Sequence, residues 1–333
     1  MRTGAWGRSA LIELSLVATL AAACSAQRGP DAARPRSIEP SPHPMSTGAA
    51  PSAGPATADA ALGEAPSCGA LGCRLYDTPE QAFARVLETQ PLILGIGEAH
   101  APKGSERIPS ATRRFSESML PALRDKASDL VIELWLPDPR CIKQSKRVEA
   151  RQKPVTESQA ETNQNDYVVF GKRSDAIGIR PHALRPTCEE YEKILAAGEG
   201  DVGVMLTLIA RHTAAQAKTL LARNQERQSP KLVLLYGGAL HNDLEPAQGR
   251  EAWSFGPELN ELTHGRYVEL DLIVPEFIKD NESWRALPWY AHFDPQKHPT
   301  KTSLFNPRPG SYVLIFPRLE PTESSRDGGV EAP

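Results

Sequence analysis

The body of this sequence lacks long apolar runs, an excess of charge and a high aromatic content. Aromatic residues make up 6% of the 333 residues, and 38 basic against 41 acidic residues give a formal net charge of −3. Such a balance provides no strongly basic surface for nucleic acid or for an anionic membrane. Beyond the extreme N-terminus, no stretch reaches the ~20 apolar residues that a membrane-spanning helix needs.

Several motifs of familiar enzymes are also missing. The sequence contains no glycine-rich phosphate loop, no Gly-x-Ser-x-Gly nucleophile elbow and no dinucleotide-binding fingerprint. None of its cysteines has the C-x-x-C spacing of a structural zinc site. What remains is an ordinary globular composition, with 40% hydrophobic and 24% charged residues.

The N-terminus has the layout of an export signal. Arg2 and Arg8 precede an apolar run, 11–23, which ends in three alanines directly before Cys24. A basic start, an apolar core and small residues are typical of a secretory signal peptide. The cysteine that follows them resembles the acylated cysteine of bacterial lipoproteins, and the alternative is ordinary secretion with cleavage near residue 23. We therefore predict a signal peptide at 1–23 and a protein exported to the cell envelope, lipid-anchored to a bacterial membrane through Cys24.

The composition then divides the chain into a tether, a body and a tail. Segment 25–66 contains eight prolines and no aromatic residue, so it cannot bury enough apolar surface to offset the entropy of ordering it. The predicted organisation is a disordered tether at 24–66, a single domain at 67–320 with an insertion at about 137–166, and a disordered tail at 321–333. The sequence leaves open whether the insertion is a lid, and what the oligomeric state is.

With Cys24 set aside, the cysteines number four: Cys68, Cys73, Cys141 and Cys188. An even number in an exported chain predicts two disulfides. Three pairings are possible. The short glycine-bearing loop between Cys68 and Cys73 favours that pair, which leaves Cys141 with Cys188.

Short apolar runs alternate with amphipathic segments along the body. The runs predict buried strands at 92–96, 130–134, 176 to about 182, 232–236, 267–274 and 312–316. The intervening patterns predict helices beginning at Thr78-Pro79 and covering 110–126, 189–197, 202–228 and 257–263. This alternation predicts an α/β fold, with a mostly parallel β-sheet flanked by helices on both faces and a site beyond the carboxyl ends of the strands.

Histidines and glutamates mark several of these strand ends. The first strand runs into Gly97-Glu98-Ala99-His100, the second carries Glu133, and a later one runs into Gly238-Ala239-Leu240-His241. A glycine at a strand exit permits a sharp turn, and a histidine three residues later can reach back over the edge of the sheet. Imidazoles and carboxylates in one cleft either bind a divalent metal ion or work as a general base with its orienting acid.

These segments resemble the superfamily of ChaN-like, Tiki/TraB and erythromycin-esterase proteins. The resemblance lies in 94–100, in the strand with Glu133, and in 236–241. It implies an α/β fold with the site at the strand carboxyl ends. Carried over by position, Glu98, His100, Glu133 and His241 would be the site. Functions in the superfamily include metal-dependent peptidases, macrolide-lactone esterases and haem-binding lipoproteins.

The sequence thus predicts a hydrolase of a peptide, ester or lactone bond, with Glu98, His100, Glu133 and His241 as its catalytic residues. A divalent metal ion would be held by His100, His241 and Glu133, or a His–Glu pair would activate water without one. The alternative is a lipoprotein that binds haem or iron and does no chemistry, and a third possibility is a degenerate member kept as an interaction module. The simpler explanations are backbone-bonded loop histidines for His100 and His241, a helix cap for Glu98 and a buried ion pair for Glu133.

Overall fold

The computed structural model describes residues 65–198 and 201–319. The predicted signal peptide, Cys24, all but the last two residues of the predicted tether and the predicted tail at 321–333 lie outside them. Within them, no helix is long and apolar enough to cross a membrane.

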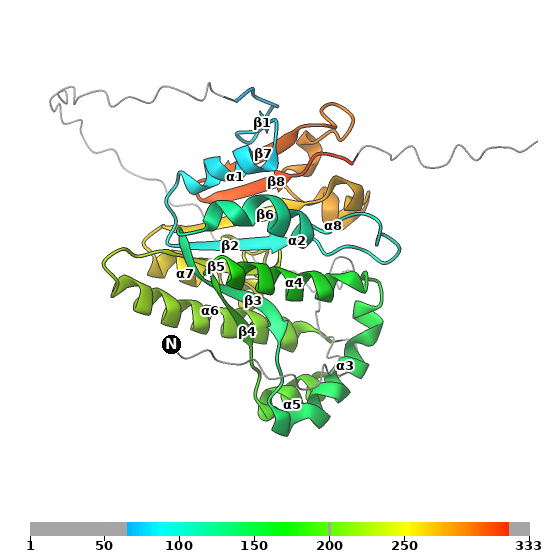
Figure 1. Cartoon of the computed structure of the whole chain (residues 1–333). Helices are drawn as coiled ribbons and strands as arrows, with labels where there is room; N and C mark the ends of the chain where they lie inside the picture. Colours follow the sequence, from blue (N-terminus) through cyan, green and yellow to red (C-terminus); the bar gives the residue numbers. More distant parts are fainter. Residues whose placement is uncertain (1–64, 199–200, 320–333) are drawn as a thin grey trace, which may run out of the picture.

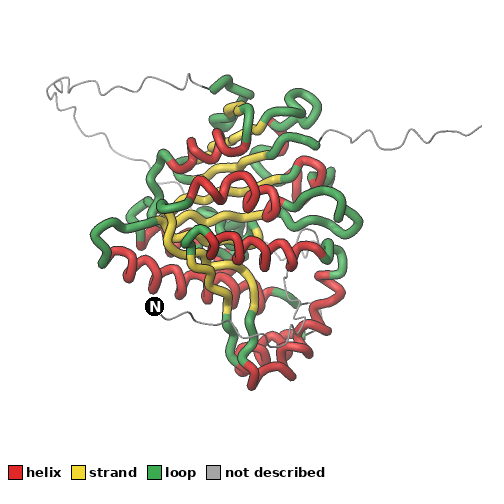
Figure 2. The backbone as a smooth tube through the Cα atoms, viewed as in Figure 1, coloured by secondary structure: helices red, strands yellow, loops and turns green. Residues whose placement is uncertain are grey.

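One eight-stranded sheet organises the described residues, in the order β1-β7-β8-β6-β2-β5-β3-β4. The central strands pair in parallel, and only β7 pairs antiparallel with its neighbours β1 and β8. Figure 2 shows the strands as one continuous twisted stack. The strands are β1 (Arg74–Tyr76), β2 (Ile93–Glu98), β3 (Ala127–Trp135), β4 (Arg180–Leu184), β5 (Leu232–Gly238), β6 (Tyr267–Ile273), β7 (Thr302–Arg308) and β8 (Ser311–Ile315).

Helices cover both faces of this sheet, which confirms the predicted α/β class. One core cluster packs α1, α4 and the turns after α2 on one face, and a second packs α5, α6 and α7 on the other. In Figure 1, α2 and α4 lie in front of the strands. The helices are α1 (Pro79–Leu87), α2 (Ala111–Arg114), α3 (Ile142–Thr156), α4 (Thr162–Ala176), α5 (Cys188–Ala197), α6 (Gly203–Gln225), α7 (Gly256–Leu262) and α8 (Glu282–Arg285).

Local sequence signals explain where several helices begin. Thr78 caps α1, and its hydroxyl accepts a hydrogen bond from the Gln81 amide at 3.3 Å. Thr187 and Glu190 form a reciprocal capping box at the start of α5. Such caps satisfy backbone N–H groups that have no partner within the helix.

The structure corrects two predicted elements. The strand expected from 176 to about 182 begins later, because its first residues are the end of α4 and a turn at Gly178, whose φ of 85° suits glycine, and β4 begins only at Arg180. The helix expected over 110–126 is α2 followed by a π-helical turn and a 3₁₀ turn that ends at Leu123. Within 137–166, α3 and the first residues of α4 are helical, and α4 packs on the core of the sheet.

Both predicted disulfides are confirmed. Cys68 pairs with Cys73, and Cys141 pairs with Cys188. The second joins the start of α3 to the start of α5 across 47 residues of sequence. Two disulfides are typical of proteins that fold in an oxidising compartment.

Candidate active site

The strands that carry the predicted site lie side by side in the middle of the sheet. β5 lies between β2 and β3, and β6 lies on the other side of β2. In register, Glu98 at the end of β2 is opposite Gly238 at the end of β5. Because the chain crosses from one side of β2 to the other between β5 and β6, this edge is a topological switch point, where α/β proteins bind their ligands.

Glu98 and His100 form the first pair. Glu98 Oε1 lies 2.7 Å from His100 Nδ1. Its other oxygen, Oε2, accepts hydrogen bonds from the Thr112 amide at 2.9 Å, the Thr112 hydroxyl at 2.7 Å and the Tyr236 hydroxyl at 3.0 Å. These donors come from the start of α2 and from β5, so Glu98 is fixed by two different elements.

Glu133 and His241 form the second pair. Glu133 Oε2 accepts the Gly238 amide at 2.8 Å, and Oε1 lies 3.8 Å from His241 Nε2. The latter distance is too long for a hydrogen bond. His241 is held from its other side, where Nδ1 lies 2.7 Å from the Trp253 carbonyl oxygen.

Gly238 links the two pairs. It lies opposite Glu98 in the sheet, and its amide donates to Glu133. Its neighbour Gly237 leaves room for the Glu133 side chain, since a Cβ at position 237 would lie 2.4 Å from Glu133 Oε2. The glycines at the end of β5 therefore bring Glu98 and Glu133 to the same edge of the sheet.

The partners of the two histidines define which nitrogen is the base. His241 Nδ1 faces a carbonyl oxygen, which only accepts, so this nitrogen carries the proton. His100 Nδ1 faces a carboxylate that already accepts three other donors, which assigns the proton to Nδ1 there too. In their neutral forms both imidazoles therefore present Nε2 as the acceptor.

Tyr167, on α4, completes the site, although no sequence motif indicated it. Its ring lies 5.8 Å from the His100 ring and 5.7 Å from the Tyr236 ring, centroid to centroid. Burial and the nearby charges of Glu98 and Glu133 raise the pKa of Tyr167 well above its usual value, so its hydroxyl stays protonated. Thr112 and Tyr236 are further contributors that sequence reasoning did not place in the site.

The site is closed to solvent in this structure. The side chains of Glu98, His100, Glu133 and His241 are 1–3% exposed. The segment after His100 is fastened to the connection between α3 and α4, since the carbonyl oxygen of Ala101 accepts the Ala160 amide at 2.8 Å and the Asn163 side chain at 3.0 Å. A substrate therefore needs movement of this segment to reach the histidines.

The predicted metal ligands do not form a ready metal site. Within the described residues, the one group with three ligand atoms within 4.8 Å of one another is Asp243, Glu269 and Asp271. The ligand atoms of His100, His241 and Glu133 are not brought together to this extent. The steps proposed below therefore use no metal ion. Binding of a divalent metal ion stays a prediction, and so does the alternative, binding of haem.

Asp243, Glu269 and Asp271 are here called the carboxylate cluster. Asp243 follows β5, and Glu269 and Asp271 lie within β6, where they pair with Gly95 and Gly97 of β2. Asp271 accepts a hydrogen bond from the Asn242 side chain at 2.9 Å, and Glu269 accepts the Leu244 amide at 2.7 Å. Burial raises the pKa of Asp243 to about 7, with a further contribution from the charge of Glu269. Burial and the neighbouring carboxylates also raise the pKa of Asp271 well above its usual value.

Comparisons with known proteins add little to this picture. No protein-family model and no curated protein matches the chain. The type III effector HopBA1 matches in structure with a TM-score of 0.36 and 10% sequence identity, over 75% of this chain and 98% of that one. A likeness at this level carries no argument about family or function, so the resemblance to the ChaN-like, Tiki/TraB and erythromycin-esterase superfamily stays a prediction.

Proposed function

We propose that this protein hydrolyses an ester, lactone or peptide bond, with a histidine–glutamate pair as the general base. The proposed base is Nε2 of His100, oriented by Glu98. The proposed electrophilic group is the Tyr167 hydroxyl, which would bind the oxyanion. Glu133 and His241 would bind the leaving group as hydrogen-bond acceptors once it has been protonated.

The observation that carries the proposal is a concentration of buried polar atoms without partners. His100 Nε2, Glu133 Oε1 and the Tyr167 hydroxyl are all buried and make no hydrogen bond within the described residues. Leaving such a group unpaired costs about 1–3 kcal/mol. The imidazole nitrogen and the carboxylate oxygen accept hydrogen bonds, and the hydroxyl donates one. A bound carbonyl substrate and a water molecule would supply the missing partners.

The first step would follow the usual chemistry of acyl hydrolysis. His100 Nε2 takes a proton from water as the oxygen attacks the substrate carbonyl, and Glu98 stabilises the imidazolium through Nδ1. The carbonyl oxygen becomes an oxyanion and accepts a hydrogen bond from the Tyr167 hydroxyl.

The second step would return the proton. The tetrahedral intermediate collapses, the bond to the leaving oxygen or nitrogen breaks, and that atom takes the proton that His100 Nε2 gained from water. The 3.8 Å between His241 Nε2 and Glu133 Oε1 supports a role for this second pair, because a hydroxyl or amine can lie between the two acceptors and donate to either. The products are a carboxylic acid and an alcohol or amine.

Turnover of three substrate classes tests this function: aryl esters, lactones and short peptides. We expect activity on at least one class. His100→Ala should lower kcat/KM by about 10²–10⁴-fold, the usual contribution of a general base, and His241→Ala should lower it about tenfold or more, because it removes a hydrogen bond to the leaving group. The control is His292→Ala, because the His292 side chain is exposed and takes no part in the proposed steps. No turnover of any class, or a wild-type rate in either site variant, would reject the proposal.

We also propose that the protein is exported and anchored through Cys24, which the two disulfides support. Cells expressing the full chain should incorporate labelled palmitate into it, and globomycin should block its processing. Cys24→Ala should abolish labelling. Labelling that persists in this variant would reject Cys24 as the lipidated residue.

A further inference from the structure

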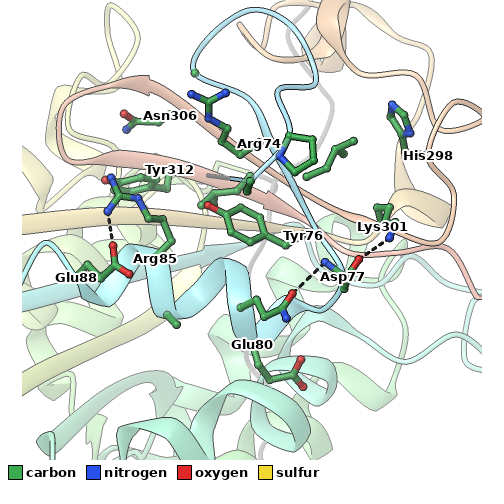
Figure 3. A pocket seen from close by; sticks show the side chains of 17 residues that line it. Arg74, Tyr76, Asp77, Glu80, Arg85, Glu88, His298, Lys301, Asn306 and Tyr312 are labelled. Carbon is green, nitrogen blue, oxygen red and sulfur yellow. Dashed lines mark hydrogen bonds and ion pairs between the residues drawn. The ribbon is translucent and has the colours of Figure 1, made fainter. Parts of the chain in front are cut away.

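A cavity lies far along the sheet from the histidines. It has a volume of about 950 Å³ and is lined by β1, α1, β7 and β8 (Figure 3). The sheet order places β6 between β8 and β2, so this cavity is not part of the site described above. Its volume is within the range of pockets that hold small ligands, ~300–1,000 Å³.

The charges around this cavity cancel. Its lining contains three basic residues, Arg74, Arg85 and Lys301, against three acidic ones, Asp77, Glu80 and Glu88. Arg85 is ion-paired with Glu88, and Lys301 with Asp77, as the dashed lines in Figure 3 show. A phosphate or another strongly charged ligand would have to break these pairs, so the lining favours a neutral ligand.

The strand beside the cavity does not offer an open edge to a peptide. The amide of Leu75, in the middle of β1, donates to the Pro66 carbonyl oxygen at 2.9 Å, and Ser67 forms an antiparallel bridge with Arg74. On its other side β1 pairs with β7. Strand addition, which needs a row of unpaired backbone groups, is therefore not favoured here.

Two tyrosines give the cavity its polar and apolar character. Tyr76 from β1 and Tyr312 from β8 both line it, close to Arg85, and Figure 3 shows the Tyr76 ring at its centre. Burial raises the pKa of both phenols, so both remain hydroxyl donors. The Tyr76 ring also offers an apolar face beside its polar tip, whereas the Tyr312 ring is mostly buried in the core.

Amide side chains supply further hydrogen-bonding groups. The Asn306 side-chain nitrogen donates to the carbonyl oxygens of Arg308 and Ser311, both at 2.8 Å. This fixes the amide and leaves its oxygen as an acceptor. Gln81 accepts the Asp77 amide at 3.1 Å through its own side-chain oxygen, which leaves its NH₂ group as a donor.

We infer that this cavity binds a neutral oligosaccharide. Sugar rings combine apolar C–H faces, which pack on tyrosine rings, with many uncharged hydroxyls that both donate and accept. The balanced charges, the phenols and the fixed amides match that chemistry. The inference is independent of the proposed hydrolase function, since none of the His–Glu residues lines the cavity.

Calorimetric titration of the purified mature protein with cellohexaose, maltohexaose and chitohexaose tests this inference. At least one of these neutral hexasaccharides should bind, and Tyr76→Ala should weaken binding about tenfold, as expected for loss of an aromatic contact and a hydrogen bond. Tyr290→Ala is the matched control, because Tyr290 lies in a short turn outside the cavity. Oligogalacturonate serves as the anionic probe.

Three results would overturn the inference: no neutral hexasaccharide binds, only oligogalacturonate binds, or binding is the same in the Tyr76 variant and the wild type. If Tyr76→Ala does not fold, as judged by circular dichroism, Tyr76→Phe and Tyr312→Phe decide instead. Each removes only a hydroxyl, and unchanged binding in both would count against the inference. Activity on esters, lactones or peptides plays no part in this test.

Discussion

Two groups of buried acids lie on or next to neighbouring strands of the sheet and behave differently. Glu98 and Glu133 each face a histidine and backbone or hydroxyl donors. In the carboxylate cluster, burial raises the pKa of each member, and the charge of Glu269 adds to this for Asp243 and Asp271. The first group leaves unpartnered basic atoms available for a ligand, whereas the second retains protons that the unfolded chain would release.

This contrast indicates why only one group suits catalysis of hydrolysis at neutral pH. A general base must have an acceptor within reach of a bound water, and His100 Nε2 is such an atom. The carboxylate cluster is already bonded to Asn242, the Leu244 amide and Ser311. We therefore expect the carboxylate cluster to affect the pH dependence of stability and not the reaction.

The largest expected effect is the difference in activity between variants of the two groups. Glu98→Gln removes the charge that stabilises the His100 imidazolium, so kcat/KM should fall about 100-fold or more. Asp271→Asn, in the carboxylate cluster, should leave kcat/KM within about twofold, because that carboxyl has no role in the proposed step. Steady-state kinetics on the best substrate measures both. Equal losses of kcat/KM in the two variants would show that the two groups of acids do not differ in function.

The next effect concerns the glycine that accommodates Glu133. In Gly237→Ala the new Cβ would lie 2.4 Å from Glu133 Oε2, so the glutamate must move and unfolding should become easier by ~2–3 kcal/mol. Gly171→Ala, in α4, would make only an ordinary contact at 3.7 Å with Pro181, and should stabilise the helix by ~0.5–1 kcal/mol. Urea denaturation compares them, and effects of the same sign would count against the packing described here.

The last effect is a pH dependence of stability caused by the carboxylate cluster. The pKa of Asp243 is raised from 3.8 to about 7, so the folded protein holds a proton that the unfolded chain releases in this range. Unfolding then releases protons, so stability should fall as the pH rises from ~4 to ~7. Asp243→Asn should flatten this decline. A decline of the same slope in the variant would show that Asp243 is not its source.

The central strands could be predicted from the sequence because they are continuous apolar runs buried on both faces. β2, β3, β5 and β6 all lie where such runs occur. β1 and β7 were not predicted, since β1 is only three residues long and β7 contains Pro307, which lies at the irregularity in the pairing of β7 with β8. They make the sheet mixed rather than wholly parallel.

The candidate site was predictable only in part. Gly-x-x-His segments at strand ends indicated His100 and His241, and a lone acid in an apolar strand indicated Glu133. Tyr167 lies in a polar helix whose sequence gives no sign of a buried hydroxyl. The carboxylate cluster did leave a signal, because Glu269 and Asp271 alternate within the apolar strand β6 and so point to one face.

The protonation state of the two imidazoles tests the central claim most directly, because it needs no substrate. Long-range ¹⁵N–¹H correlation spectra at about pH 8, where an ordinary histidine is neutral, report which ring nitrogen carries the proton, and His100→Ala and His241→Ala assign the signals. The account predicts a protonated Nδ1 and a free Nε2 in both rings. A protonated Nε2 in His100 would contradict it, because that nitrogen could then not accept a proton from water.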